Sequence, residues 1–147
     1  MKSTPKKIRD DVFWQSVYKL VERIYNKIDD LIADFPAEEW LTANKLRCSA
    51  NDSLFYISQV VGSVAPETSK YDLNNARKYL FTLQSMYTFA SKQKFLELEP
   101  EIIVEIDNIL HEIDKRVKNS DTEAEKKNKE ELEPWMEKYR LWQKMQD

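Results

Sequence analysis

The chain contains a single glycine, Gly62, among its 147 residues. Average usage of about 7% would supply roughly ten. Tight hairpins, left-handed turns and phosphate-binding loops all need the backbone freedom that glycine provides at low cost. The scarcity of glycine therefore excludes a glycine-rich nucleotide-binding loop and leaves a helical fold as the expected architecture.

Metal and nucleophile chemistry is equally restricted, because the sequence holds one cysteine and one histidine. A zinc site needs several such ligands, and a di-iron bundle needs two Glu-x-x-His pairs. Cys48 would need His111 as its base, and we do not expect that pair to form a catalytic site. We therefore expect no catalytic residue, no metal, no cofactor and no enzymatic activity.

Apolar residues recur with the 3.6-residue period of a helix in four segments. These segments cover approximately residues 12–32, 36–62, 67–95 and 100–117. Asp10-Asp11 suit the N-terminus of the first helix, Pro36 and Pro100 are placed to open the second and the fourth, and Gly62 is placed to end the second. The expected apolar stripes are Phe13, Trp14, Val17, Leu20, Val21, Ile24, Tyr25, Ile28, Leu31 and Ile32; Leu41, Leu46, Ala50, Leu54, Ile57 and Val61; Leu73, Ala76, Leu80, Leu83, Tyr87 and Ala90; and Ile102, Ile103, Ile106, Ile109, Leu110, Ile113 and Val117.

The short connections between these segments favour antiparallel packing of sequential helices. We therefore predict an all-α fold, an antiparallel up-down-up-down four-helix bundle formed by residues 1–117. The longest uncharged stretch, residues 53–66, is too short and too polar to span a bilayer. A cytoplasmic location without a membrane partner is expected.

The composition changes after Val117. Residues 118–133 contain four lysines, six acids and only two apolar residues, which indicates a solvated helix extension or a flexible charged linker. Pro134 then introduces an aromatic-rich cluster whose spacing predicts a short amphipathic helix. Its candidate partner-docking residues are Trp135, Met136, Tyr139, Trp142 and Met145.

A segment of about 14 residues cannot bury such an apolar face by itself. The segment could fold back on its own bundle, pack on a second copy of the chain, or dock into a groove of a protein partner. Large aromatic residues and methionine are enriched at interface hot spots. The charged tether before the segment tips the expectation slightly toward a partner.

The third and fourth segments carry opposite charge within a chain whose formal net charge is −3. The basic positions of the third region are Lys70, Arg77, Lys78, Lys92 and Lys94. They could form weak ion pairs with the acidic fourth segment, or form a basic strip that contacts the phosphates of RNA or DNA. The overall acidity of the chain favours the ion pairs.

A group of residues in the second segment indicates close packing. Arg47 lies within an otherwise apolar stretch, and Cys48, Ser49, Ala50 and Ser53 are small. A close helix crossing inside the bundle, or between subunits, explains these residues without any chemistry. We assign Arg47, Cys48 and Ala50 to packing or to an oligomer interface.

Residues 13–96 resemble the four-helix-bundle proteins encoded in 23S ribosomal RNA intervening sequences, a family related to the accessory protein of diversity-generating retroelements. The resemblance is carried by Trp14, Leu20-Val21, Ile24-Tyr25, Phe35-Pro36, Glu38-Glu39, Leu46-Arg47-Cys48, Ala50, Ile57, Ala76-Arg77, Leu80, Leu83, Phe89-Ala90 and Phe95-Leu96. The chain departs from the family at Cys48, Gln59 and Lys78-Tyr79.

This resemblance implies a homo-oligomer, often a pentameric ring, without enzymatic activity. It further implies binding of RNA, or of a reverse transcriptase as an accessory subunit. The leading hypothesis is accordingly a non-enzymatic adaptor for a nucleic-acid-handling protein, and the alternative is a direct RNA- or DNA-binding module.

Overall fold

All elements of the chain are α-helices in the part that the computed structural model describes, residues 5–31, 39–63 and 66–146. The helices are α1 (Pro5–Asp10), α2 (Val12–Leu31), α3 (Trp40–Gly62), α4 (Pro66–Lys92) and α5 (Pro100–Gln146). No strand occurs in those three ranges. The predicted all-helical fold is therefore confirmed.

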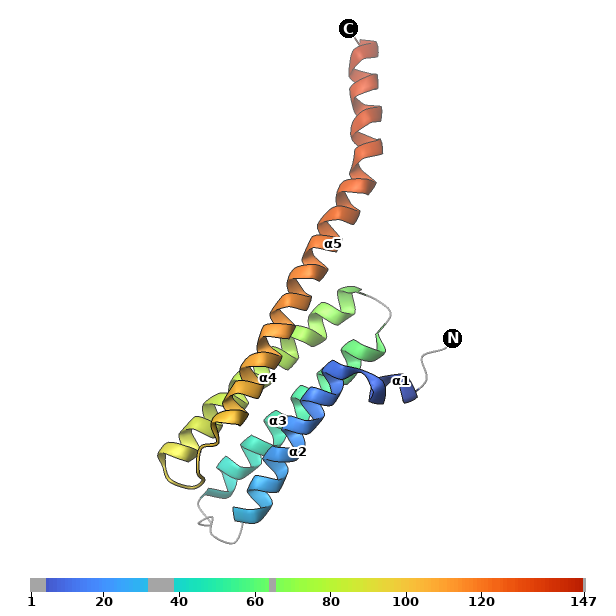
Figure 1. The fold of residues 1–147 in the computed structure, drawn as a ribbon. Helices are drawn as coiled ribbons and strands as arrows, with labels where there is room; N and C mark the ends of the chain where they lie inside the picture. Colours follow the sequence, from blue (N-terminus) through green and yellow to red (C-terminus); the bar gives the residue numbers. More distant parts are fainter. Residues whose placement is uncertain (1–4, 32–38, 64–65, 147) are drawn as a thin grey trace.

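Helices α2, α3 and α4 and the first part of α5, up to Val117, share one apolar core. We call this part of the structure the helical body, or the body. Helix α3 packs against α2 and α4, and α5 packs against α4 and α2. The short α1 rests on α2 and α3 (Figure 1). The closest association is between α3 and α4, where small side chains such as Ala50 and Ala76 are fully buried.

Most of the expected core positions are buried. Trp14, Tyr25, Leu54, Val61, Ile103 and Val117 are only partly buried and pack against the core, and Ile32 lies outside the described residues. The expected positions on α4, from Leu73 to Ala90, are all buried, and so, apart from Ile103, are those on α5 from Ile102 to Ile113. Leu41, which we expected in the core, is 68% exposed. Leu41 lies in the first turn of α3, and Thr42 and Ala43 are the residues of that turn that face inward.

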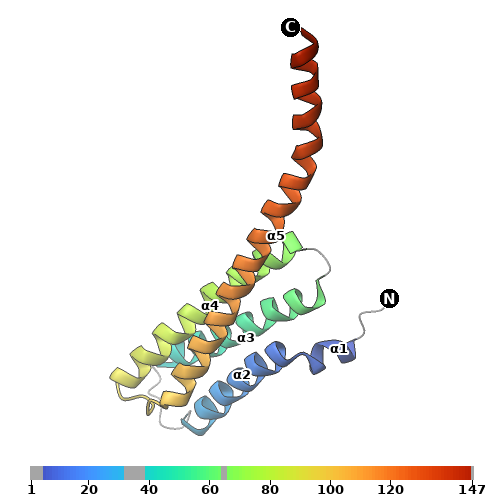
Figure 2. The same cartoon turned by 45° about the horizontal axis from the view of Figure 1, so that its top comes forward.

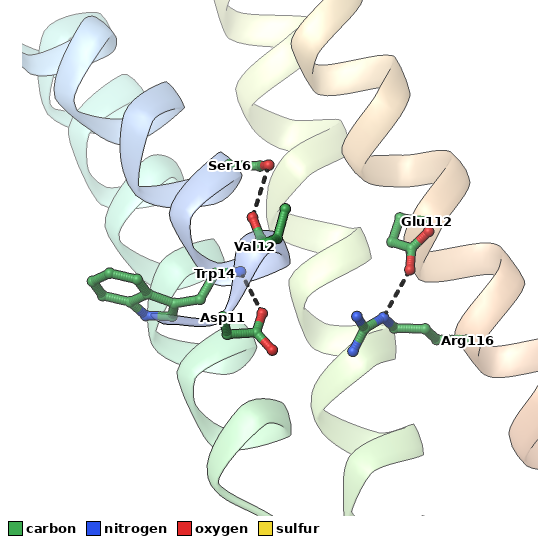
Figure 3. A network of polar contacts seen from close by, with 6 residues as sticks. All are labelled: Asp11, Val12, Trp14, Ser16, Glu112 and Arg116. Atoms are coloured by element: carbon green, nitrogen blue, oxygen red, sulfur yellow. Dashed lines mark hydrogen bonds and ion pairs between the residues drawn. The ribbon is translucent and has the colours of Figure 1, made fainter. Parts of the chain in front are cut away.

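Two predicted helix starts are observed and one lies outside the described residues. Asp11 caps α2, because its Oδ1 accepts a hydrogen bond from the backbone N–H of Trp14 at 2.8 Å (Figure 3). Pro100 opens α5 as expected. Pro36 is not among the described residues, and the α3 that the structure shows begins at Trp40.

In the described part of the chain, a left-handed turn lies at a lysine and not at the glycine. Gly62 ends α3 as predicted, but its φ is not positive and Ser63 after it is extended. Among the described residues the positive φ belongs to Lys94, at 64°. The Phe95 N–H donates to the Ala90 carbonyl and the Lys94 N–H to the Ser91 carbonyl, which is the Schellman pattern that ends α4.

The segment 118–133, for which a linker leading to a separate short helix was one expectation, is part of α5. Helix α5 runs without interruption from Pro100 to Gln146, and Pro134 lies inside it. The reason is local: lysine, glutamate and alanine are strong helix formers, and extending an existing helix avoids the cost of a new nucleus. The solvated helix extension is therefore the alternative that the structure supports.

Tyr87 fixes the turn that leads into α5. Its side chain is fully buried, and its hydroxyl oxygen accepts a hydrogen bond from the backbone N–H of Glu99 at 2.8 Å. Glu99 in turn precedes Pro100, the first residue of α5, and its carbonyl accepts the N–H of Ile102. Burial raises the pKa of Tyr87 above its ordinary value of 10.0.

We expect Lys94→Gly to stabilise the fold by about 1 kcal/mol, because glycine adopts a left-handed conformation without the penalty of a Cβ. Gly62→Ala is the matched control. A Cβ at Gly62 meets nothing within 4 Å, so alanine should be neutral or stabilising by about 0.5 kcal/mol. Urea unfolding of both variants measures these changes. A destabilised Gly62→Ala protein would show that the glycine is required after all.

We expect Tyr87→Phe to lose about 1 kcal/mol near neutral pH, because the Glu99 N–H loses its acceptor. The folded-state pKa of Tyr87 is raised, so its contribution is complete below pH 10 and is lost as the pH rises through the folded-state pKa. The stability difference between wild type and variant should therefore narrow in alkaline solution. Chemical unfolding at pH 8 to 11 measures it, and a constant difference would contradict the assignment.

Candidate protein-interaction site

Helix α5 is much longer than the helices on which it packs. With 47 residues it is about 70 Å long, whereas the 27 residues of α4 extend for about 40 Å. Beyond the body it projects as a single helix (Figures 1 and 2). We call residues 118–146 the arm, and every residue of the arm from Thr122 onward is exposed.

One side of the arm is apolar. The residues that form this apolar stripe are Leu132, Trp135, Met136, Tyr139 and Trp142, which are between 52% and 71% exposed. At 3.6 residues per turn they occupy an arc of about 120°. The rings of Tyr139 and Trp142 stack at 6.0 Å between centroids, and the Lys138 Nζ lies 5.6 Å from the Trp135 ring centroid.

Four of the five predicted docking residues thus lie together on the stripe. The fifth, Met145, is 83% exposed but lies about 60° beyond the edge of the stripe. Leu132 completes the stripe at the end nearer to the body. None of these side chains contacts the body, so the structure does not show fold-back, which was one of the three alternatives for this segment.

From Thr122 onward the arm lacks the tertiary contacts that normally stabilise a helix. Most helical stability in proteins comes from burial of an apolar face, and this part of the arm buries none. Pro134 adds to the difficulty, because an interior proline removes one backbone hydrogen bond and costs about 3 kcal/mol. Covering the stripe would stabilise both the apolar side chains and the helix that carries them.

The residues of the predicted basic strip fall into two groups, those that form ion pairs with α5 and those that do not. The Lys70 ammonium pairs with Asp121, and the Arg77 Nε lies 2.8 Å from Asp114. These two cations are thus engaged within the chain, as the ion-pair interpretation expected. Lys78, Lys92 and Lys94 are exposed and make no ion pair with the described residues.

Three exposed aromatic residues, which were not among the predicted binding residues, share the outward face of α4 with Lys78. They are Tyr71, Phe81 and Phe89, which are 66%, 45% and 45% exposed. The Arg77 guanidinium lies 4.8 Å from the Phe81 ring centroid. Their spacing of 10 and 8 residues places them on one side of a helix, opposite the buried positions, and this period was the available signal.

The packing group on α3 separates into three environments. Ala50 is fully buried, Cys48 is exposed, and Arg47 is partly buried with its Nη2 2.9 Å from the Asp29 carboxylate. The expected close crossing inside the body is therefore wrong for Cys48, because its side chain points outward. The Ser49 and Ser53 hydroxyls donate to carbonyls of their own helix, so they are satisfied without a ligand.

A groove of about 480 Å³ lies between the start of α2 and α5. Three of its polar side chains interact with their own helix: the Arg116 Nε pairs with Glu112 at 3.0 Å, and the Ser16 hydroxyl donates to the Val12 carbonyl (Figure 3). The Arg116 guanidinium also covers the Phe13 ring at 4.4 Å. The groove offers no nucleophile with an adjacent base, and we assign it to packing between α2 and α5.

Within the described ranges, no group of three or more His, Cys, Asp or Glu side chains is arranged to hold a metal ion. No described helix is long and apolar enough to cross a membrane.

Comparisons with family models, with curated proteins and with solved structures find no match to this chain. The resemblance to the proteins of ribosomal RNA intervening sequences consequently stays a prediction. The function has to be inferred from the surfaces of the chain itself.

We expect nucleic-acid binding through α4 to be weak and only mildly dependent on salt. With Lys70 and Arg77 paired, at most three cations of the strip are available, so the slope of log affinity against log salt for single-stranded RNA should be no steeper than about −2. Filter binding across a salt series measures the slope. A slope near −3.5, as five contacts would give, would show that α5 releases both cations.

Proposed function

We propose that this protein is a non-enzymatic adaptor that works by binding other protein chains, with the arm as its main docking element. The observation that carries the proposal is the apolar stripe, five large side chains on one side of a projecting helix. Aromatic residues and methionine dominate this stripe, and these residue types carry much of the binding energy at protein interfaces.

The mode of binding follows from the shape of the stripe. An amphipathic helix recognises a partner by laying its apolar side against a groove or against another helix, with anchors spaced three and four residues apart. Leu132, Trp135, Tyr139 and Trp142 have this spacing. Because the arm extends away from the body, a partner can approach its stripe without displacing any core helix.

We further propose that the body is an antiparallel up-down-up-down four-helix bundle. Its support is the pattern of helix contacts, α2 with α3, α3 with α4, α4 with α5 and α2 with α5, together with the alternating directions in which these four helices run (Figure 1). A rigid bundle of this kind is a suitable base for a projecting arm.

The family resemblance supplies candidate partners for this adaptor. It favours a homo-oligomeric ring, a pentamer, and a nucleic-acid-handling protein such as a reverse transcriptase. The exposed Cys48 is compatible with an oligomer interface on α3. Neither partner is required by the stripe itself, whose chemistry demands only an apolar surface that is complementary to a helix.

Direct binding of RNA or DNA is the second candidate function. Its support is the outward face of α4, where Tyr71, Phe81 and Phe89 lie beside Lys78, because exposed aromatic rings can stack with unpaired bases. The engagement of Lys70 and Arg77 by acids of α5 counts against it. We therefore rank it below the adaptor.

A photo-crosslinking amino acid in place of Tyr139 is expected to give a discrete adduct with another protein chain in cells that make this protein at its natural level. The same amino acid in place of Glu137, which lies about 160° from Tyr139 around the helix, should give none. Electrophoresis detects the adduct and mass spectrometry identifies the chain.

A chain ending at Val117 provides the control for folding, and we expect it to keep its cooperative thermal unfolding because no core residue lies in the arm. Loss of that cooperative transition would place the arm in the folding unit. Absence of an adduct from position 139, or equal adducts from both positions, would overturn the adaptor proposal.

A further inference from the structure

We propose that the first chain to cover the stripe is the arm of a second copy, paired with it in antiparallel orientation about a two-fold axis near Glu137. This inference rests on the proposed function, because it identifies a partner for the same docking element. It is carried by two independent properties of the exposed arm, the order of its charges and the register of its apolar residues.

In the last part of the arm, residues 130–146, the charge changes sign between Glu137 and Lys138, so this part has an acidic half and a basic half. Residues 130–137 contain four glutamates and no lysine or arginine, whereas residues 138–146 contain three cations and no acid. All of these charged residues are exposed, and the body neutralises none of them through an ion pair. An antiparallel pair places each acidic half beside the basic half of the other copy, whereas a parallel pair places like charges together.

The spacing of the apolar residues places the two-fold axis at the same point, near Glu137. Leu132, Trp135, Tyr139 and Trp142 alternate in steps of three and four, the repeat that forms the seam between two helices. The antiparallel register that sets Leu132 opposite the partner's Trp142 also sets Trp135 opposite the partner's Tyr139. The two-fold axis of that register passes at Glu137, next to the point at which the charges reverse.

Pro134 does not obstruct this pairing. It lies about 130° from the centre of the stripe, so its ring and the Glu130 carbonyl that it leaves without an intrahelical donor both face away from the seam. The arrangement is isologous, with the same surface used by both copies, as in most homodimers.

The paired arms would hold two bodies apart. Val117 lies 20 residues from the axis, so each body begins about 30 Å from it along the helix, on opposite sides. Two copies of any surface on the body, including the outward face of α4, would then be presented together. A bivalent adaptor gains avidity for a repetitive or dimeric target without any new contact.

Two charge variants of the full-length chain test the order of the charges. The all-acidic arm carries Lys138→Glu, Arg140→Glu and Lys144→Glu, and the all-basic arm carries Glu130→Lys, Glu131→Lys, Glu133→Lys and Glu137→Lys. We expect wild type to be dimeric by light scattering at micromolar concentration. Each variant alone should dimerise at least about tenfold more weakly, and an equimolar mixture should restore the dimer.

The mixture separates pairing between arms from a local effect of the charges on helix stability, because only pairing can be rescued by the opposite variant. Wild type that stays monomeric, or a mixture without rescue, overturns the antiparallel pair. A monomeric wild type whose position 139 still crosslinks to a different protein would leave the adaptor proposal intact. Loss of that crosslink as well would remove both.

The orientation is tested with single cysteines in a Cys48→Ser background. In the proposed register Asn128 lies opposite the partner's Gln146, whereas in a parallel pair these two positions are about 27 Å apart along the helix. Oxidation of an equimolar mixture of Asn128→Cys and Gln146→Cys chains should therefore give the mixed disulfide. Disulfides only between identical positions, or none, would overturn the antiparallel register.

Discussion

The length of α5 relative to the helices beside it is the constraint on which the rest of the structure depends. Its buried stripe, from Ile102 to Ile113, closes the core that α2, α3 and α4 form. The helix then continues for a distance that none of these neighbours can cover (Figure 1). A helix that closes a core at one end must expose its remaining side chains at the other, and here those side chains include two tryptophans.

The turn before α5 determines where the arm points. The Tyr87 hydroxyl oxygen accepts a hydrogen bond from the Glu99 N–H. Lys94 adopts the left-handed conformation with which α4 ends and the chain reverses. Two ion pairs between α4 and α5, at Asp114 and Asp121, then tie the helices together up to the place where the arm leaves the body. Two cations of α4, Lys70 and Arg77, thus help to align α5, and fewer cations of α4 are available to bind phosphate groups.

Helical periodicity predicted the buried faces of α4 and α5 well, because the centre of an apolar stripe faces the core of the protein. It was less reliable at helix ends. Leu41 fits the stripe of α3 but lies in its first turn, where the neighbouring helices do not reach. The left-handed turn at Lys94 was not predicted, because the need for such a turn arises from how two helices meet, and a lysine adopts it at an energetic cost.

The sequence by itself determined the helical class, the buried stripes and the chemistry of the arm, since composition and spacing fix which side of each helix is apolar. It also contained the charge reversal between Glu137 and Lys138. Only the tertiary structure decided that the charged segment extends α5, that Lys70 and Arg77 are engaged by acids, and that the stripe is left uncovered. These outcomes depend on which surfaces meet in space, and a local pattern of residues does not specify that.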